Sequence, residues 1–272
     1  MTKLVQLPRA VSWADSLVRD PNPPVNLFAI ARQCGIQVLA LRPIIPKGLL
    51  LPVVGGFEVY LRDPSRRDLD IGEPEPPDLL SPRQRFTLAH EIVHTRFYKK
   101  VPDKMPVPDN TVPNGMDLED ICDRVAGIIL IPTVLIKKEL TNPDEIDASF
   151  VRSLASKYRS SAAVVIERLA IVEPSNLFER CILLVRRRDG DAEIRSFYFG
   201  DGMLPLLVRP KPYSRLTEWI PDIPGSALQG HHQSDCSVVR KERLITFTSV
   251  ELSNPGEFLL QVQAVPGRSP VT

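Results

Sequence analysis

The sequence predicts an α+β protein whose helices come first and whose strands come last. Before residue 175, apolar residues recur mostly at helical spacing; after it, short apolar runs are separated by glycine turns. Prolines, 27 among 272 residues, separate these blocks. Hydrophobic residues make up 43% and charged residues 25%, which is typical of a globular protein and excludes a wholly disordered or fibrous chain.

The first part is expected to begin with two short helices and two strands. The helices are expected over residues 12–19 and 27–34, and the strands over residues 36–41 and 56–62. Asn26 can cap the second helix and Gly35 can end it. In the second strand Phe57, Val59 and Leu61 alternate with more polar residues, which predicts that one face of this strand is buried. The proline-rich stretch 63–82 is expected to be a surface loop.

The longest helices are expected in the middle of the chain. Ser81 suits the N-cap and Pro82 the first position of a helix that runs to Tyr98. Its core-facing side is expected to hold Phe86, Ala89 and Val93. After a proline-rich loop over residues 101–115, helices are expected over residues 118–130, 133–140 and 148–172, the last interrupted at residues 159–161.

Strands dominate the last part of the expected fold. They are expected over residues 181–187, 193–199, 244–249 and 258–265. Asp189–Gly190 is a typical hairpin turn between the first two. These patterns divide the chain into a first domain at residues 1–140, a helix-turn-helix-like hairpin at residues 141–174 and a β-rich domain at residues 175–272.

Composition limits the class of protein further. No apolar run reaches the ~18 residues of a membrane span, and the N-terminus lacks the apolar core of a secretory signal. The four cysteines are dispersed without CxxC spacing, as in a protein with reduced thiols. The 34 basic and 33 acidic residues neither favour nor exclude a nucleic-acid partner. We expect a cytoplasmic protein with no membrane partner, and nothing indicates its oligomeric state.

The segment His90–His94 has the pattern HExxH on a predicted helix. Histidines four residues apart share a helix face, so both rings can bind one Zn²⁺. Glu91 points aside from the rings, which suits a catalytic base that takes a proton from the attacking water. The pattern therefore predicts a zincin-like helical core with a small sheet. The alternative is that both histidines are partly buried side chains bonded to backbone carbonyls.

A catalytic zinc needs a third protein ligand and an open position for water. The other histidines, His231 and His232, lie in a distant polar segment, so a carboxylate from the next helix is the better source. We expect Glu119 to bind the ion and Asp123, one turn on, to accept the free N–H of a ligand histidine. Acids in the first turn of a helix are also ordinary dipole partners, so that alternative stays open. Cys122 is expected in the core.

Two motifs together closely resemble the ImmA/IrrE metallopeptidases. They are RFTLAHEIVH at residues 85–94 and ExxCDxxA at residues 119–126, the latter followed by ILIP at residues 129–132. The sequence departs from the family at three positions. Asp123 stands where asparagine is common, Ile131 where methionine is usual, and Val93 where glycine or serine is frequent. The resemblance covers roughly residues 20–172.

The resemblance implies roles for these residues. By similarity, His90, His94 and Glu119 bind zinc, and Glu91 is the catalytic carboxylate. Family members are cytosolic bacterial or phage peptidases that cut a helix-turn-helix (XRE-type) repressor and so release stress-response or mobile-element genes. IrrE-like proteins carry a GAF-like sensor domain where this chain is β-rich. Two histidines and a glutamate also suit Mn²⁺ or another divalent ion, so the metal stays open.

A peptide substrate needs a strand edge to lie on. Residues 56–62 could offer backbone groups for strand addition, with Glu58 and Tyr60 as substrate contacts. We expect Tyr60→Pro to block substrate pairing and leave the zinc site intact. An amphipathic strand that only covers the helices explains the same pattern. Tyr98 is a candidate second oxyanion donor only by proximity; packing at the helix end is the alternative.

The main alternative function is a DNA-binding regulator or sensor with an inactive peptidase-like core. Residues 154–169 have the rhythm of a helix-turn-helix. A recognition helix, however, presents Arg, Lys, Asn or Gln to base edges at its N-terminal end, and this one presents Ser160, Ser161 and Ala162. The pattern therefore favours docking onto a repressor over direct binding of DNA. The basic run 186–188 suits a solvated hairpin end better than a phosphate site.

Overall fold

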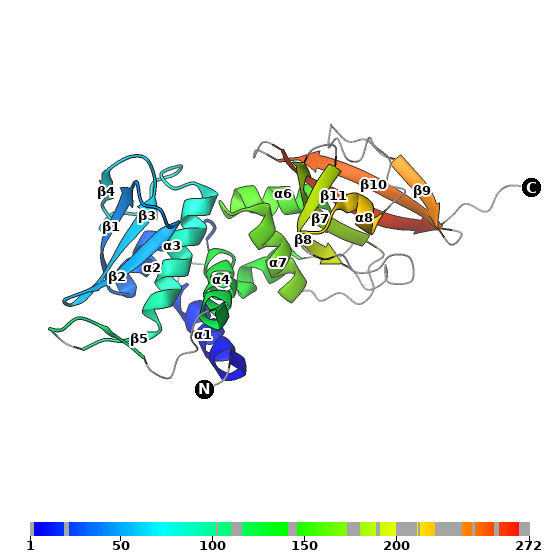
Figure 1. The fold of residues 1–272 in the computed structure, drawn as a ribbon. Coiled ribbons are helices and arrows are strands. Elements are labelled where there is room, and N and C mark those ends of the chain that lie inside the picture. The colour runs from blue at the N-terminus through cyan, green and yellow to red at the C-terminus, as the bar shows by residue number, and fades with distance from the viewer. Residues whose placement is uncertain are drawn as a thin grey trace, which may run out of the picture. The chain divides into compact units, whose positions relative to one another are not determined.

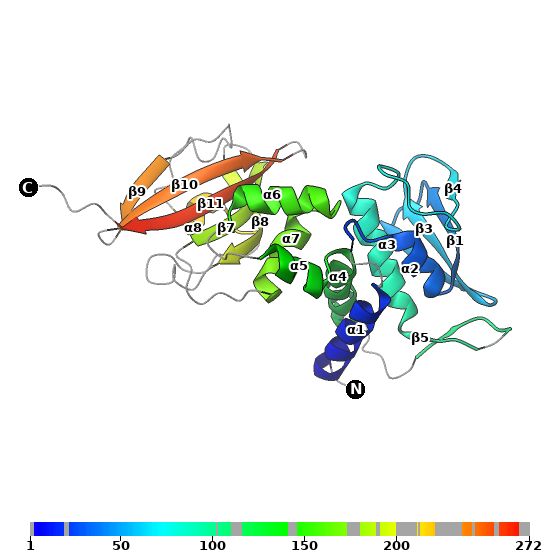
Figure 2. The same cartoon turned by 180° about the vertical axis from the view of Figure 1, so that it is seen from behind.

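The structure is a computed structural model that describes residues 3–18, 22–101, 103–109, 116–140, 146–172, 180–188, 191–199, 211, 213–220, 236–240, 243–252 and 256–266. The α+β class is confirmed (Figure 1, Figure 2). The chain divides into two compact units, one comprising Met1–Leu135 with Lys157–Ser161 and the other Ile136–Ser156 with Ala162–Thr272. The division after residues 140 and 174, and the zincin-like and GAF-like assignments, stay predictions. No helix of the described residues is long and apolar enough to cross a membrane.

The first unit contains a four-stranded sheet with the strand order β2-β3-β1-β4. The strands are β1 (Ile36–Arg42), β2 (Gly48–Val53), β3 (Gly56–Arg62) and β4 (Arg67–Leu69). β3 lies inside the sheet, parallel to β1 on one side and antiparallel to β2 on the other. Its residues Phe57, Val59 and Leu61 are fully buried, which confirms the predicted alternation.

The helices of this unit are α1 (Lys3–Leu17), α2 (Leu27–Gln33), α3 (Pro82–Thr95) and α4 (Met116–Leu130). The division between the two units falls within the next helix, α5 (Thr133–Glu139). α3 packs against β2, β3 and α4, and α1 packs against α4 (Figure 1). A small ribbon of β5 (Tyr98–Lys99) and β6 (Val107–Pro108) follows α3. α3 therefore ends before Tyr98, which pairs in β5 instead of closing the helix.

Local capping explains where the central helices begin and end. Ser81 and Gln84 form a capping box at the start of α3: the Ser81 hydroxyl accepts from the Gln84 N–H at 3.2 Å, and Gln84 Oε1 accepts from the Ser81 N–H at 2.9 Å. The Asn26 side chain accepts from the Ala29 N–H at 3.1 Å, as predicted for a cap. Gly35 ends α2 with a φ of +82°. These caps fix both ends of the predicted α2 and the start of α3.

The buried side of α3 differs from the expected one. Ala89 and Val93 are buried as predicted, but Phe86 is only half-buried and lies 6.5 Å from the His90 ring, centroid to centroid. Arg85 instead occupies the fully buried side one position earlier. Phe86 was expected on the buried side because the helical period alone does not reveal that a guanidinium with a buried carboxylate partner can lie in the core.

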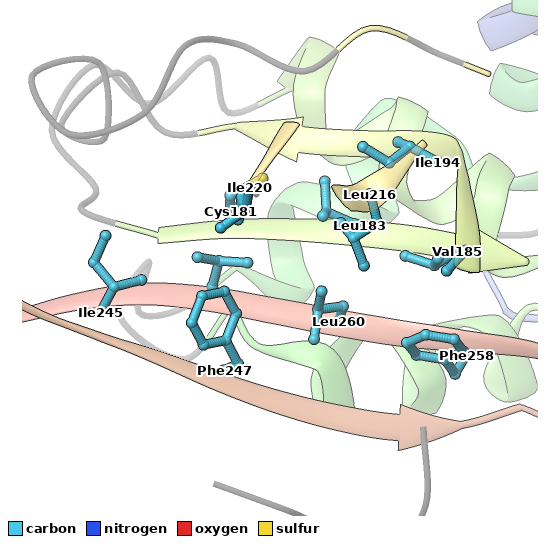
Figure 3. Close-up of a cluster of buried hydrophobic side chains, with 12 residues drawn as sticks. Cys181, Leu183, Val185, Ile194, Leu216, Ile220, Ile245, Phe247, Phe258 and Leu260 are labelled. Carbon is cyan, nitrogen blue, oxygen red and sulfur yellow. The ribbon is translucent and has the colours of Figure 1, made fainter. Parts of the chain in front are cut away.

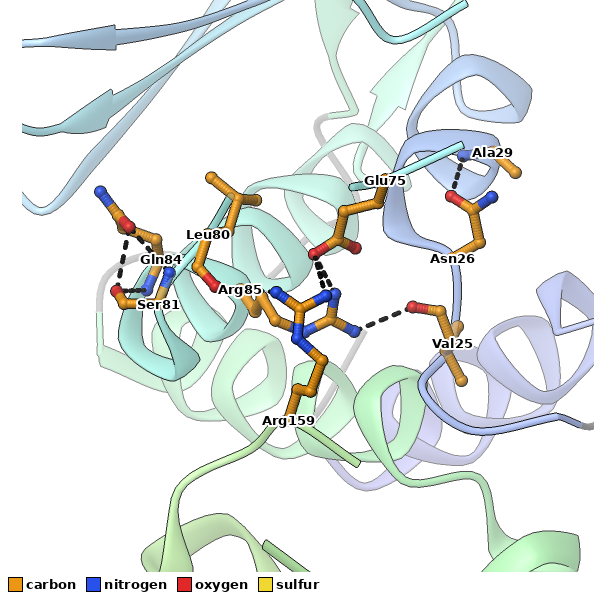
Figure 4. A network of polar contacts seen from close by, with 9 residues as sticks. All are labelled: Val25, Asn26, Ala29, Glu75, Leu80, Ser81, Gln84, Arg85 and Arg159. Carbon is orange, nitrogen blue, oxygen red and sulfur yellow. Dashed lines mark hydrogen bonds and ion pairs between the residues drawn. The ribbon is translucent and has the colours of Figure 1, made fainter. Parts of the chain in front are cut away.

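A buried ion-pair network surrounds the start of α3 (Figure 4). The Arg85 guanidinium pairs with Glu75 and donates to the Val25 carbonyl at 2.8 Å. Arg159 also lies against Glu75, at 3.4 Å, and donates to the Leu80 carbonyl at 3.2 Å. The stretch 63–82 was expected to be a surface loop. This is wrong in part, because it forms β4, supplies the buried Glu75 and places Leu80 in the core.

The second unit is built on a five-stranded antiparallel sheet with the strand order β8-β7-β11-β10-β9. The strands are β7 (Arg180–Arg188), β8 (Asp191–Phe199), β9 (Cys236–Arg240), β10 (Arg243–Glu251) and β11 (Glu257–Pro266). The helices are α6 (Ala148–Lys157), α7 (Ala162–Val172) and α8 (Leu216–Trp219). The four predicted strands and the two-part helical hairpin are confirmed, whereas β9 and α8 were not predicted.

A cluster of buried apolar side chains covers one face of this sheet (Figure 3). Leu183 and Leu260 lie on neighbouring strands, and Leu216 of α8 packs against the same cluster. Arg186 pairs with Glu257 and Arg187 with Glu251, so both guanidinium groups already have carboxylate partners, which disfavours a phosphate site; the solvated hairpin end stays a prediction. The predicted turn at Asp189–Gly190 and the residues His231 and His232 lie outside the described residues.

Candidate metal centre

The helices α3 and α4 bring four predicted site residues together. His90 and His94 lie one turn apart on α3, which packs directly against α4. On α4 the apolar side faces the core, and Glu119 and Asp123 lie on the other side, with their side chains 58% and 57% exposed. The two imidazoles are largely covered, at 14% and 18% exposed. The site therefore combines largely buried imidazole rings with solvent-exposed carboxylates.

Polar atoms of three side chains lie close together. His90 Nε2 lies 2.9 Å from His94 Nε2 and 3.1 Å from Glu119 Oε2, and His94 Nε2 lies 3.5 Å from Glu119 Oε1. Ligand atoms that surround a tetrahedral Zn²⁺ at 2.0–2.1 Å are separated from one another by roughly 3.3 Å. The separations observed here bracket that value, so the donor set fits a small divalent ion.

Asp123 sets the orientation of the His90 ring. Its Oδ1 lies 2.8 Å from His90 Nδ1, which leaves Nε2 directed at His94 and Glu119. Burial lowers the pKa of His90, but the Asp123 hydrogen bond and the nearby carboxylates outweigh it and raise the pKa. Burial and the neighbouring His90 lower the pKa of His94. His94 thus favours the neutral form that a metal ligand requires.

Glu91 is buried next to this centre. Its exposed fraction is 8%, and burial raises the pKa of its carboxyl to about 7, with Glu119 adding to the rise and His90 opposing it. A carboxyl with such a pKa can both take up and release a proton near neutral pH. This is the behaviour that general acid–base chemistry requires.

Cys122 is the residue whose position the sequence interpretation described only in part. Its side chain is fully buried, as expected of a core residue. Its sulfur nevertheless lies within 4.8 Å of a ring nitrogen of both His90 and His94, so it is a second potential ligand. The signal was its spacing of three residues from Glu119, which places both on one helix face. Burial raises the pKa of this thiol, which disfavours the thiolate that binds metals.

The two predicted substrate contacts, Glu58 and Tyr60, lie on the internal strand β3. Gly56–Arg62 is paired on both edges, by β1 and by β2, so the expectation that it offers a free edge is wrong. Glu58 and Tyr60 alternate with the buried residues of β3, and the Tyr60 hydroxyl donates to Glu58 Oε2 at 2.6 Å. Tyr60→Pro is therefore expected to break the sheet rather than block a substrate. Tyr98 packs edge-on against Phe57, with ring centroids 5.4 Å apart.

The free edge beside the centre belongs to β2 instead. Among the described strands β2 is an edge of its sheet, and a Cβ built at Gly48 would lie 2.5 Å from Glu91 Oε1. Sequence reasoning missed this strand because its run of three leucines followed by a proline does not alternate. A proline is nevertheless allowed on an edge strand, where an N–H can point to solvent.

Comparison with known proteins adds a family to this geometry. Residues 77–170 match the family described as the IrrE N-terminal-like domain. No curated protein matches the sequence. Among solved structures, a Mycobacterium tuberculosis transcriptional regulator aligns with a TM-score of 0.47 and 12% identity, over 93% of this chain and 74% of that chain. The matched range contains both motifs and the four residues that α3 and α4 bring together, and over residues 77–170 this chain is therefore similar to the IrrE N-terminal-like peptidase domain.

Proposed function

We propose that this protein is a metal-dependent endopeptidase whose divalent ion, Zn²⁺ in the first instance, is held by His90, His94 and Glu119. The observation that carries the proposal is that the two ring nitrogens lie 2.9 Å apart and that each lies within 3.5 Å of a Glu119 carboxylate oxygen. The similarity of residues 77–170 to the IrrE N-terminal-like peptidase domain supports it. Mn²⁺ or another divalent ion suits the same ligands.

Glu119 is the third ligand in this proposal, rather than Cys122. The Glu119 carboxylate oxygens already lie within 3.5 Å of the two ring nitrogens, and the Glu119 side chain is exposed to solvent. The Cys122 thiol must lose a proton in a buried place that disfavours the charge. A carboxylate from the solvent side also leaves room for water and substrate.

Each residue then has a separate chemical role. A bound divalent ion supplies Lewis-acid polarisation of the scissile carbonyl and acidifies the attacking water. Glu91 takes the proton from the water and passes it to the departing amine, which suits a carboxyl with a pKa of about 7. Asp123 holds the His90 ring so that Nε2 stays directed at the centre.

The substrate is proposed to lie along β2. The Lys47 carbonyl accepts from the Arg62 N–H at 2.9 Å, so residue 47 points its backbone groups at β3. In an antiparallel pair the direction alternates, which leaves the backbone groups of Gly48, Leu50 and Pro52 on the outer edge. An extended peptide can pair with those groups with little dependence on its sequence. Gly48 lies against Glu91, so this edge ends beside the proposed base.

The proposed substrate is a helix-turn-helix (XRE-type) repressor, whose cleavage in the cytoplasm would release stress-response or mobile-element genes. The partner follows from the family resemblance. The start of α7 supports docking over direct binding of DNA: Ser160 and Ala162 are buried, and Arg159 lies against Glu75 and Leu80. Buried Ser160 and Ala162 do not offer exposed side chains that could reach base edges. The β-rich second unit is proposed to be a regulatory, GAF-like domain.

The proposal is tested by incubation of the purified protein with the helix-turn-helix repressor encoded beside its gene. We expect two fragments in the presence of Zn²⁺ and none after chelation. Glu91→Gln is the control: it should keep the metal, because Glu91 is not a ligand, and should abolish cleavage. An intact repressor at full metal occupancy of the native protein would refute cleavage of this substrate. A salt-dependent shift of random duplex DNA would instead favour a DNA-binding regulator.

A further inference from the structure

The backbone conformation at position 48 does not require a glycine. Its φ lies outside the left-handed region, unlike Gly55 in the same hairpin, whose φ is +84°. Any L-residue can therefore adopt the backbone conformation of Gly48. Gly48 lies opposite Leu61 of β3, and α3 packs against both strands. The reason for a glycine at this position must be the space beside it.

That space is filled by α3. A Cβ built at Gly48 would lie 2.5 Å from Glu91 Oε1, closer than real Cβ atoms approach, and 3.2 Å from Glu91 Cδ, which is tighter than most real contacts. It would also lie 2.5 Å from the methyl carbon of Thr87. Both α3 side chains are only 8% exposed, so neither lies in open solvent. The missing side chain at Gly48 is what leaves room for the Glu91 carboxylate.

We propose that Gly48 is a positioning residue. Because it has no side chain, the backbone of β2 lies directly against the Glu91 carboxylate and holds it beside the metal centre. The inference rests on the proposed function, in which Glu91 moves the proton. It also links the two parts of that function, because the strand that limits Glu91 is the edge proposed to bind the substrate. A substrate paired to β2 is then placed in register with the base.

A side chain at position 48 is expected to move Glu91 rather than the helices. The strand is held by its pairing with β3, and the start of α3 is fixed by its capping box and by buried Arg85. The Glu91 carboxylate, in contrast, lies at the end of a rotatable side chain. His90 is oriented separately by Asp123. The metal ligands should therefore stay in place while the base is displaced.

The first test compares Gly48→Ala with Gly72→Ala. A Cβ at the exposed Gly72 would meet Asp70 Oδ1 at 2.9 Å, so it also crowds a carboxylate, but on a solvated loop. We expect Gly48→Ala to lower kcat for the repressor by roughly 100-fold, the effect of about 1 Å of misplacement. KM and the Kd for Zn²⁺ should stay within about twofold, and Gly72→Ala should change none of these. A loss of metal affinity that matches the loss of kcat would overturn the inference.

A double-mutant cycle separates positioning from general damage. Asp at position 91 is one methylene shorter and should not reach a Cβ at position 48. We expect Gly48→Ala to cost less than about threefold in kcat in the Glu91→Asp background, because coupled residues are not additive. Equal costs in both backgrounds would show that the alanine acts without Glu91. Thr87→Ser removes the other crowded group, and restoration of kcat by this change would assign the effect to Thr87 instead.

A crystal structure of Gly48→Ala decides the inference without any cleavage assay. We expect the Glu91 carboxylate to have moved away from residue 48, with the rings of His90 and His94 unmoved. A shifted β2 with an unmoved carboxylate would contradict positioning. If the native protein cleaved no repressor, the proposed function would fail on its own assay, and the displacement of Glu91 would still be measured here.

Discussion

At the scale of single residues, burial shifts the pKa values of two neighbouring groups of α3 in opposite directions. Burial raises the pKa of Glu91 to about 7 from an ordinary value of 4.5, whereas it lowers the pKa of His94. Both shifts favour the neutral form of the side chain. In the absence of a cation, Glu91 and His94 therefore favour their neutral forms, whereas the Asp123 hydrogen bond and the nearby carboxylates raise the pKa of His90.

The raised pKa of Glu91 predicts how the metal-free protein responds to pH. The folded state binds the Glu91 proton more tightly than the unfolded state, so the stabilisation is complete below pH 4.5 and is lost as pH rises through about 7. Glu91→Gln removes this dependence. In chelator, we expect the native protein to lose about 3 kcal/mol of unfolding free energy relative to Glu91→Gln between pH 4.5 and 8. Urea titrations with parallel pH profiles would contradict this.

The two acids of α4 are expected to differ in their effect on metal binding. Asp123→Asn weakens the hold on the His90 ring and should raise the Kd for Zn²⁺ by roughly 10–100-fold, as for other partners of ligand histidines. Glu119→Gln removes a ligand and should raise Kd further. Competition with a chelating dye measures both. Cys122→Ser is the matched control on the same helix; a larger effect of Cys122→Ser than of Glu119→Gln would exchange their roles.

At the scale of elements, the position of α3 decides the geometry of the site. Its start is held by the Ser81 capping box and by the buried pairing of Arg85 with Glu75, which Arg159 joins from the turn before α7 (Figure 4). His90 lies little more than one turn beyond Arg85. The same buried contacts therefore fix the helix that carries both imidazoles.

Removal of the shared carboxylate is expected to be far more costly than removal of the cap. Glu75→Gln leaves two guanidinium groups without their counter-charge, one of them fully buried, and should cost about 3–5 kcal/mol. Ser81→Ala removes one cap and should cost about 1 kcal/mol. Chemical denaturation of both variants measures the difference. Similar losses would mean that the ion pair is hydrated rather than buried.

The edge of β2 is the second element on which the proposed function depends. Leu50→Pro removes an outward N–H that a substrate could use, as Pro52 already lacks one. We expect KM for the repressor to rise by at least about tenfold, the loss of one well-placed hydrogen bond, with the Kd for Zn²⁺ unchanged. Leu50→Ala is the control, because it shortens the side chain and keeps the N–H. Equal KM values for the two variants would place the substrate elsewhere.

At the scale of the whole molecule, the sequence predicted the features that depend on residues close together in the chain. Asn26 and Ser81 cap their helices because their side chains bond within a few residues, which a sequence displays. The helical period placed His90 near His94, and Glu119 near Asp123. The convergence of the two pairs on one point follows from the packing of α3 on α4, which the motif resemblance indicated and the apolar faces allow.

Long-range contacts explain what the sequence did not reveal. Strand β2 is defined by its pairing with β3 and not by its own sequence pattern. Because β3 pairs with both β1 and β2, it is internal, and the substrate edge expected on β3 lies on β2 in the proposed function. Glu75 is buried because Arg85 and Arg159 reach it from 10 and 84 residues away in sequence. The close approach of the Glu91 carboxylate to Gly48 likewise depends on the packing of β2 against α3, which the sequence does not show.

The central claim is that two histidines of α3 and one carboxylate of α4 bind a single divalent ion. X-ray absorption at the zinc edge of the stoichiometrically loaded protein measures the ligands directly. The account predicts two imidazole nitrogens and carboxylate or water oxygens at 2.0–2.2 Å, with no sulfur, and loss of an oxygen ligand in Glu119→Gln. A sulfur at about 2.3 Å would assign the site to Cys122 and contradict the account.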